Sequence, residues 1–275
     1  MDIVKSDNNK KHLLQALNAL SSNHLQASET SLYQDFIAHA VQEHLDIDYL
    51  QRPLEMVFWN LYGLFKLLHQ PSKETWLDGS YRGQIRIFNP DRAIDGWNGG
   101  HTVIYVNRLD RPFLVDSLRI ALNAESPTIY NLRSIPLWVQ RDDDGGVLTA
   151  LSATDELEGA QRESLITIEI ECRQAAEMAQ LQDLLERVMR DVDAVVDDFE
   201  RMRADLQVVI EDLAEHTPAS AERDENVAFL QWMWDGAFVF LGSVEYTLTI
   251  CNGKDALREE PASRNGLFAI WDEDP

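Results

Sequence analysis

Three features of the sequence predict an α+β protein in which helices pack on a mainly antiparallel sheet. Residues 101–106 form an apolar segment that leads through a short polar loop into an amphipathic helix at 112–122. Residues 164–171 alternate apolar and polar side chains, which is the period of a half-buried strand. From residue 178 to 213, apolar residues recur at spacings of three and four, as in a long helix. Strands interleaved with helices in this order favour the α+β class.

The first of these features is a βα unit with a short connection. His101–Val106 is rich in β-branched and aromatic residues, which favour strands, and Asn107–Arg111 is polar. Pro112 suits the first position of a helix, where its missing N–H is not needed. The side chains that repeat at helical spacing after it are Leu114, Val115, Leu118, Ala121 and Leu122.

The long periodic segment is a heptad seam of about five repeats. A continuous helix there would be roughly 50 to 60 Å long at about 1.5 Å per residue, too long for a small sheet to cover. One interpretation is a helical hairpin within the chain, about residues 175–235, and the other is a coiled coil between two chains. We favour the hairpin because Phe229, Trp232 and Met233 offer a local partner face. The seam consists of Met178, Leu181, Leu185, Val188, Val192, Val195, Phe199, Met202, Leu206, Val209 and Leu213.

The same reasoning assigns the rest of the chain. Composition and periodicity predict short helices at 11–20 and 31–45 and a helix that begins at Pro53. Alternation predicts a strand at 84–88, an extended segment at 128–140, and an acidic glycine turn at 142–146 with a partner strand at 147–153. A mobile surface loop is expected at 154–163 and a strand-like segment at 237–250.

From residue 84 onward the element order approximates the βαββαβ of an ACT-like, ferredoxin-like domain. We therefore predict three parts. These are an N-terminal helical segment at 1–80, an ACT-like domain at 81–251 that includes the long helical hairpin, and the start of a following region at 252–275.

Composition limits the partners and the compartment. The formal net charge of −23 over 275 residues repels phosphate backbones and anionic membrane surfaces, so we expect neither nucleic acid nor a membrane as a partner. No apolar segment resembles a signal peptide or a membrane span. Cys172 and Cys251 are far apart and form no CxxC motif. A cytoplasmic protein with both thiols in its core is expected.

No motif for catalysis or cofactor binding is present in the sequence. It has no GxGxxG after a strand, no GxSxG, no HExxH and no P-loop. His39 and His44 lie five residues apart on a predicted helix, where they are not expected to share a face and bind zinc. Asp142–Asp144 lacks the EF-hand spacing. We therefore expect no catalytic residue, no cofactor and no metal in this chain.

Several segments carry a family resemblance. They are FNP at Phe88–Pro90, DGW at Asp95–Trp97, HTV at His101–Val103, RPFLVDSL at Arg111–Leu118, ESLITIEIE at Glu163–Glu171 and FVFLGSVEY at Phe238–Tyr246. In order and spacing they resemble the N-terminal region of the large bacterial NAD-specific glutamate dehydrogenases. The resemblance implies ACT-like regulatory units that precede the catalytic domain of a much longer polypeptide. It also implies that the parent enzyme uses NAD to convert L-glutamate and water to 2-oxoglutarate and ammonium.

The resemblance further implies an amino-acid effector site at the strand-to-helix turn, where ACT domains commonly bind ligands. Exposed N–H groups at the start of the helix would meet a ligand carboxylate, with a favourable contribution from the helix dipole. Arg111 would pair with that carboxylate, and Asp110 or Asp116 with the amino group. Phe113 occupies the place of the glycine that usually lets a ligand approach the backbone. The predicted effector-binding residues are Asn107, Asp110, Arg111, Phe113, Leu114 and Asp116.

Two functions follow from these features. The first is a regulatory and assembly region of a glutamate dehydrogenase, joined to the catalytic domain in a homo-oligomer and sensing an amino-acid effector. The second is an interaction scaffold without a small-molecule ligand, in which the heptad seam forms a homodimer and the ring of Phe113 closes the pocket. A free-standing enzyme has almost no support.

Overall fold

The computed structural model describes residues 2–45, 49, 51–69, 76–77, 80–81, 83–125, 128–142, 146–151, 159–251 and 254–271. The chain forms two compact units. Unit 1 is Met1–Asp110 with Leu118–Glu186, and unit 2 is Arg111–Ser117 with Arg187–Pro275. The sequence also predicts domain boundaries at residues 80 and 251. The two compact units do not test whether those domains fold independently, so the boundaries stay predictions.

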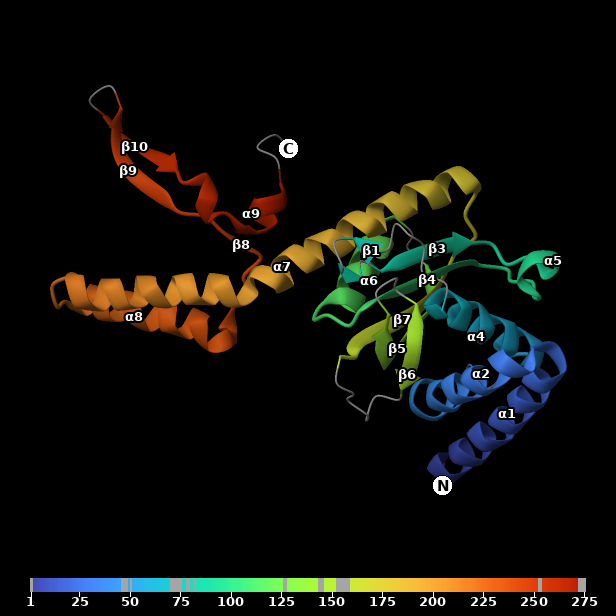
Figure 1. Ribbon diagram of the computed structural model, residues 1–275. Helices are drawn as coiled ribbons and strands as arrows, with labels where there is room; N and C mark the ends of the chain where they lie inside the picture. Colours follow the sequence, from blue (N-terminus) through green and yellow to red (C-terminus); the bar gives the residue numbers. More distant parts are fainter. Residues whose placement is uncertain are drawn as a thin grey trace. The chain divides into compact units, whose positions relative to one another are not determined.

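The centre of unit 1 is a five-stranded antiparallel sheet with the strand order β3-β4-β7-β5-β6 (Figure 1). The predictions of an antiparallel sheet and of the α+β class are confirmed. The edge beside β4 is taken by β3, which precedes β4 in the chain, so the sheet forms without a strand from residues 237–250. The strands are β3 (Gln84–Phe88), β4 (Thr102–Leu109), β5 (Ile129–Arg141), β6 (Val147–Leu151) and β7 (Gln161–Ile170).

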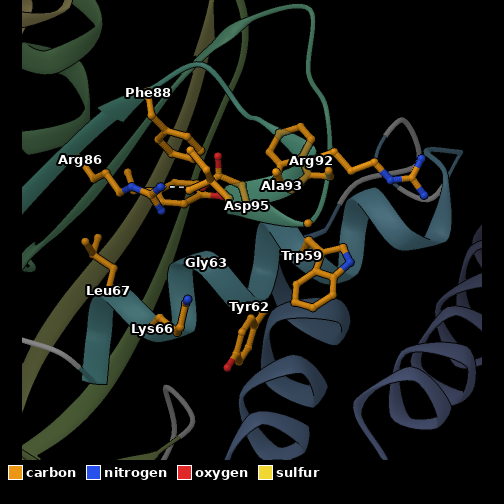
Figure 2. Close-up of a pocket in the computed structure, with 14 residues that line it drawn as sticks. Trp59, Tyr62, Gly63, Lys66, Leu67, Arg86, Phe88, Arg92, Ala93 and Asp95 are labelled. Carbon is orange, nitrogen blue, oxygen red and sulfur yellow. Dashed lines mark hydrogen bonds and ion pairs between the residues drawn. The ribbon is translucent and has the colours of Figure 1, made fainter. Parts of the chain in front are cut away.

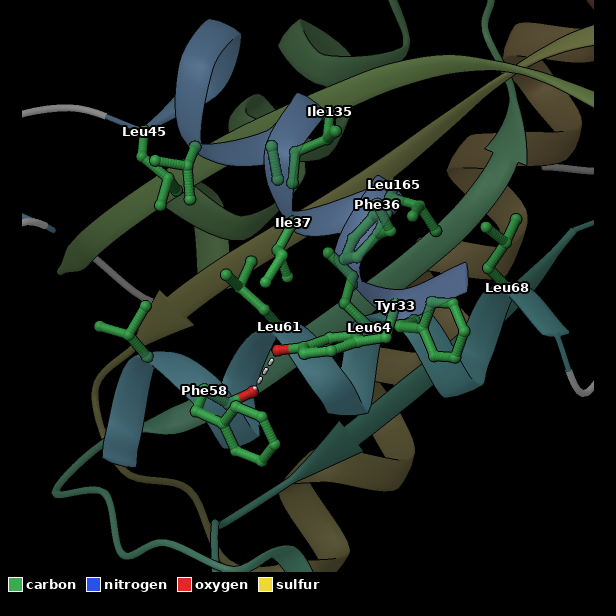
Figure 3. Close-up of a cluster of buried hydrophobic side chains, with 14 of the residues drawn as sticks. Tyr33, Phe36, Ile37, Leu45, Phe58, Leu61, Leu64, Leu68, Ile135 and Leu165 are labelled. Atoms are coloured by element: carbon green, nitrogen blue, oxygen red, sulfur yellow. Dashed lines mark hydrogen bonds between the residues drawn. The ribbon is translucent and has the colours of Figure 1, made fainter. Parts of the chain in front are cut away.

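One face of this sheet packs against the N-terminal helices (Figure 3). Tyr33 lies at the centre of the core, where its hydroxyl donates a hydrogen bond to the Phe58 carbonyl at 2.9 Å. Leu165 and Ile135 reach the same core from paired positions of β7 and β5. The predicted N-terminal helices are confirmed as α1 (Asp2–His24), α2 (Ala27–His39) with the π-helical turn η1 (Ala40–His44), and α4 (Leu54–His69).

The opposite face of the sheet is also buried. Ile104 on β4 and its partner Ile168 on β7 have no exposed surface, although they point away from the Tyr33 core. Helix α6 (Leu114–Glu125) and the first turns of α7 (Ala175–His216) carry the buried side chains that can pack on this face. Unit 1 is therefore a sheet buried on both faces.

The βα unit is confirmed, but its helix begins two residues after Pro112. The residue between them, Phe113, has φ +65° and is the one non-glycine residue with a positive φ in the described part of the chain. A left-handed residue cannot continue a helix, so α6 starts at Leu114. The Ser117 N–H then donates to the Phe113 carbonyl at 2.8 Å, which closes the first turn.

The long helix α7 is confirmed and is continuous over 42 residues. Its C-terminal part and α8 (Ala221–Trp232) run side by side as a hairpin within unit 2 (Figure 1). Ser220 caps α8 by accepting a hydrogen bond from the Arg223 N–H. The guanidinium of Arg203 on α7 lies 4.5 Å from the ring centroid of Trp234, just after α8. The chain thus contains a helical hairpin, while the alternative of a coiled coil between two chains is not tested by a single chain and stays a prediction.

Three sequence-based predictions need correction. The segment 237–250 yields β8 (Gly242–Ser243) and β9 (Tyr246–Cys251), and β9 pairs with β10 (Lys254–Glu259) instead of joining the large sheet. Residues 161–163 belong to β7 and not to a surface loop, because Glu163 is held in a buried ion pair. Cys172 and Cys251 are both exposed, so neither is a core residue.

Short elements complete the described chain. They are β1 (Trp76–Leu77), β2 (Ser80–Tyr81), α5 (Arg92–Asp95), the π-helical turn η3 (Met233–Ala237), the 3-10 turn η4 (Pro261–Ser263), β11 (Asn265–Gly266) and α9 (Leu267–Ile270). Residues 143–145 of the predicted acidic turn and 154–158 of the predicted loop lie outside the described residues.

Candidate functional site

Asp110, at the end of β4, is held by two side chains of β7. Its Oδ1 accepts a hydrogen bond from the Ser164 hydroxyl at 2.6 Å, and its Oδ2 lies 2.9 Å from Nε of Arg162. Its N–H donates to the Arg162 carbonyl at 2.8 Å. Both carboxylate oxygens therefore fasten the end of β4 to β7.

Arg111 pairs with carboxylates of α7. Its Nε lies 3.3 Å from Asp193, and its Nη1 lies 2.5 Å from Asp197. The Arg111 side chain is 20% exposed. The guanidinium fork thus already binds two carboxylates of the protein itself. An effector carboxylate at Arg111 would have to share the guanidinium with them.

The remaining predicted effector residues have different surroundings. Asn107 is fully buried, and its side chain acts to lower the pKa of the Glu163 carboxyl group. Phe113 is 48% exposed, and closure of the ligand site by its ring stays a prediction. Leu114 is buried and Asp116 is exposed. The assignment of these six residues to one effector site stays a prediction.

A row of polar groups lies on the sheet face beneath the N-terminal helices. Nε and Nη2 of Arg141 lie 2.6 and 2.7 Å from the two carboxylate oxygens of Glu163, and both side chains are almost fully buried. Burial raises the pKa of Glu163, although Arg141 acts in the opposite direction. Arg141 also donates to the carbonyl of Leu68 at 3.3 Å, which ties the end of α4 to β5.

A second buried carboxylate, Glu169, pairs with Arg52 and lies 3.8 Å from Nδ1 of His101. The neighbouring Tyr49 donates a hydrogen bond to Asn60 Oδ1 at 2.7 Å, and Arg133 lies 3.8 Å from the centroid of its ring. Burial raises the pKa of Tyr49, and the two arginines nearby oppose that shift. The charged groups of this row pair with one another, which indicates a structural role.

A pocket of about 530 Å³ lies between α4 and the segment from β3 to α5 (Figure 2). Its walls carry Lys66 from α4, Arg86 from β3 and Asp95 from α5, and Tyr105 of β4 is also in contact with it. Nη2 of Arg86 donates to Oδ1 of Asp95 at 2.5 Å. The lining residues are Trp59, Tyr62, Gly63, Lys66, Leu67, Arg86, Phe88, Arg92, Ala93, Ile94, Asp95, Gly96, Trp97 and Tyr105.

Two glycines allow the walls of this pocket to come together. A Cβ at Gly63 would lie 3.0 Å from the ring of Tyr105, so a larger residue would force α4 away from β4. Gly96 has φ +81°, and a Cβ there would lie 2.4 Å from the indole of Trp59. The DGW segment of the sequence therefore marks a turn that packs on α4.

The sequence analysis did not predict the pocket. Arg86 and Phe88 alternate with Ile85 and Ile87, so the strand pattern did place the first two on one face. Nothing in the sequence indicated that α4 would supply the opposite wall, because Lys66 and Arg86 come together only through tertiary packing.

The two N-terminal histidines are closer than the sequence suggested. The rings of His39 and His44 have centroids 4.9 Å apart, because the chain forms a π-helical turn between them and brings residues five apart together. The pKa of His44 is lowered by burial and by His39. Within the described residues, no three metal-binding side chains gather at one place.

The chain resembles known proteins over most of unit 1. The family model described as glutamate dehydrogenase, ACT1 domain, matches residues 36–185, which include the five-stranded sheet and the pocket. An NAD-specific glutamate dehydrogenase of Halomonas elongata is 36% identical over 191 residues, 68% of this chain and 12% of that protein. One of Pseudomonas aeruginosa is 33% identical over 169 residues, 60% of this chain and 10% of that protein. The chain thus aligns with about a tenth of these relatives' length.

Proposed function

Since the chain belongs to the NAD-specific glutamate dehydrogenase family through its ACT1 domain, we propose that it is a non-catalytic regulatory and assembly region of a longer enzyme. In this proposal the whole enzyme uses NAD to oxidise L-glutamate to 2-oxoglutarate and ammonium, with catalytic residues outside this chain. The whole enzyme would be a cytoplasmic homo-oligomer. In the described chain, no helix combines the length and apolar character needed to cross a membrane.

The observation that carries the assembly role is a group of exposed apolar side chains on one face of the hairpin of β9 and β10, with Asp255 and Glu259 beside them on the same face. Tyr246, Leu248 and Ile250 alternate along β9, and Leu257 pairs with Leu248 from β10. All four side chains are between 52% and 74% exposed. A two-stranded sheet is marginally stable alone, and a contiguous apolar face on it favours a contact surface. We define these four residues as the hairpin face.

We propose that the hairpin face contacts the remainder of the polypeptide. The aligned relatives are about ten times longer than the matched segment, so the parent enzyme supplies ample surface for such a contact. Regulation then requires that the contact differ between two conformations of the catalytic region. A contact of equal strength in both conformations would not shift the equilibrium between them.

The test uses the full-length enzyme with Leu248→Asp. A charge placed in a buried apolar contact should weaken assembly or change activity, measured by light scattering coupled to size exclusion and by NADH formation. The matched control is Lys254→Gln, because Lys254 is exposed on the other face of the hairpin and its loss also lowers the net charge by one. Unchanged assembly and activity in Leu248→Asp would refute the role of the hairpin face.

The second candidate function is amino-acid sensing at residues 107–116. It is supported by the family resemblance and by Arg111, a partly exposed guanidinium at the start of α6. The internal pairs of Arg111 with Asp193 and Asp197 favour the scaffold without a ligand. A thermal-unfolding screen of this chain against the proteinogenic amino acids separates the two. A ligand at about one hundred times its dissociation constant should add roughly 2.7 kcal/mol, and the gain should vanish in Arg111→Ala.

A further inference from the structure

The pocket between α4 and the segment from β3 to α5, which we call the α4 pocket, has the opposite charge to the molecule as a whole. The chain carries a formal net charge of −23. The lining of the α4 pocket contains three cationic residues, Lys66, Arg86 and Arg92, and a single acidic residue, Asp95. A locally positive hollow on so acidic a chain favours an anionic ligand.

Lys66 supplies a positive charge that the described part of the protein does not neutralise. No described carboxylate lies within ion-pair distance of Lys66, and its Nζ lies 5.2 Å from the ring centroid of Tyr62. Tyr62 in turn donates a hydrogen bond to Glu29 at 3.1 Å, so its ring is fixed. Burial and Glu29 raise the pKa of Tyr62 to about 12, so it stays a neutral phenol. Lys66 is thus positioned, but its three donors are not committed to an anion of the described chain.

Arg86 is held in place by its hydrogen bond to the carboxylate of Asp95. That carboxylate is 8% exposed and also accepts the Asp91 N–H at 3.0 Å, so it is fixed by the start of α5. The Arg86 side chain is 40% exposed, and its guanidinium lies 4.0 Å from the ring centroid of Phe88. A guanidinium has five N–H donors, and the bond to Asp95 uses one of them. The others remain for a ligand.

The two cations occupy opposite walls of the pocket. Figure 2 shows Lys66 rising from α4 and Arg86 lying along β3, whereas Arg92 extends away from both. Arg92 is also mostly exposed and lies 4.0 Å from Glu55, so it belongs to the rim. An anion between the walls would therefore contact Lys66 and Arg86 first.

The other lining groups fit a planar body. Aromatic rings of Trp59, Tyr62 and Phe88 contribute to the walls, and the volume of about 530 Å³ is in the range of small-molecule sites. Aromatic side chains stack on planar rings, and a cation over an aromatic face is attracted to it. A small anion without a ring, such as inorganic phosphate, would leave most of this apolar wall uncovered.

We propose that the α4 pocket binds a small organic anion that carries a planar ring, with its phosphate or carboxylate between Lys66 and Arg86 and its ring against the aromatic wall. This ligand site is separate from the turn at residues 107–116 and does not depend on the proposed function. It gives unit 1 a means of responding to a metabolite through α4, which packs on the sheet core.

The test is equilibrium binding to the full chain, measured by calorimetry. Adenosine monophosphate is the probe for a phosphate on a planar ring, and indole-3-acetate is the probe for a carboxylate. Adenosine carries the ring without the anion, and inorganic phosphate carries the anion without the ring. We expect one of the two probes to bind at least about tenfold more tightly than both controls, because charge-assisted hydrogen bonds and stacking act together.

Variants locate the site. Lys66→Ala should weaken the probe about tenfold or more, Lys66→Arg should restore most of the affinity, and Lys254→Ala, outside the pocket lining, should leave it unchanged. Circular dichroism of each variant verifies folding. The proposal fails if neither probe binds more tightly than adenosine and phosphate, or if a probe binds Lys66→Ala as tightly as the unaltered chain.

Discussion

The two units differ in how completely they bury their apolar side chains. Unit 1 buries both faces of its sheet, and only four large hydrophobic residues in its described part are exposed. The described part of unit 2 exposes fifteen, among them the hairpin face and Trp271. A protein surface tolerates single exposed apolar residues, but contiguous ones indicate a contact. The described part of unit 1 therefore has a closed core, and the described part of unit 2 carries the exposed apolar side chains on which the proposed contact role rests.

The two units also differ in the kinds of interaction that hold them together. The buried charges of unit 1, such as Glu163 and Glu169, have partners inside the same unit. Unit 2 contains most of the long helix α7, on which the seam residue Met202 is buried, whereas the predicted seam residue Val209 is exposed and its neighbour Ile210 is buried instead. Substitutions in unit 1 should thus act on folding, and substitutions on unit 2 should act on assembly.

The largest effect is expected from Glu163→Ala in unit 1. The substitution leaves the guanidinium of Arg141, which is 4% exposed, without its carboxylate. Removing one partner of a buried ion pair costs about 3 to 5 kcal/mol. The measurement is the free energy of unfolding in urea at neutral pH.

The control for this prediction replaces both partners. In Arg141→Met/Glu163→Leu no charge is left unpaired, so the loss should be much smaller than in Glu163→Ala. If the single variant is as stable as the unaltered chain, the description of unit 1 as a closed core with paired charges is wrong.

A second prediction compares the same truncation in the two units. Leu61 on α4 is fully buried and Leu248 in the hairpin face is 68% exposed. Leu61→Ala should destabilise this chain by about 2 to 5 kcal/mol, because it removes buried methyl groups and leaves a cavity. Leu248→Ala should change the free energy of unfolding by less than about 0.5 kcal/mol. Equal losses in the two variants would contradict the difference between the units.

A third prediction concerns Phe113, whose φ of +65° is unfavourable for a residue with a Cβ. Because the ring is half exposed, little packing is lost on its removal. Phe113→Gly should therefore stabilise the chain by about 1 kcal/mol, whereas Phe113→Ala keeps the Cβ and should give no such gain. Thermal unfolding of the two variants in parallel separates backbone strain from packing. A gain in both would show that the exposed ring, and not φ, is unfavourable.

Much of the fold was predictable because local periodicity reports local structure. The strand at 84–88, the βα unit and the helix from 178 onward appear where the sequence places them, since each is defined by side chains that alternate or repeat within it. The partners of those elements were less predictable. The sequence of residues 237–250 predicts a strand-like segment, but its side-chain pattern does not say whether the partner is the large sheet or β10.

Site residues were harder to predict for the same reason. Asp110 and Arg111 were identified as polar residues at a turn, but their pairs with Arg162 and with Asp193 join segments more than fifty residues apart. The α4 pocket likewise needs Lys66 and Arg86 from two elements that meet only in the folded chain. The unpredicted burial of Glu163 has the same origin, because its partner Arg141 lies on the neighbouring strand.

The smallest effect is a pH dependence confined to unit 1. His69 at the end of α4 is partly buried, and burial lowers its pKa from 6.5, although its hydrogen bond to the Phe65 carbonyl acts the other way. A lowered pKa in the folded state means that folding favours the neutral imidazole. The stabilising contribution is therefore complete above about pH 6.5 and is lost as the pH falls through the lower folded pKa. Stability in urea should fall from pH 7.5 to pH 5.5, and His69→Gln should make that fall smaller.

The matched control is His216→Gln, because His216 is 72% exposed on α7 in unit 2. Its substitution should leave the fall between pH 7.5 and pH 5.5 unchanged, because its pair with Asp212 joins two exposed side chains and contributes little to stability. His44, whose pKa is also lowered, accounts for the dependence that remains in His69→Gln. If His69→Gln and His216→Gln reduced the pH-dependent loss of stability equally, the pH response would lie in both units. That result would contradict a pH response confined to unit 1.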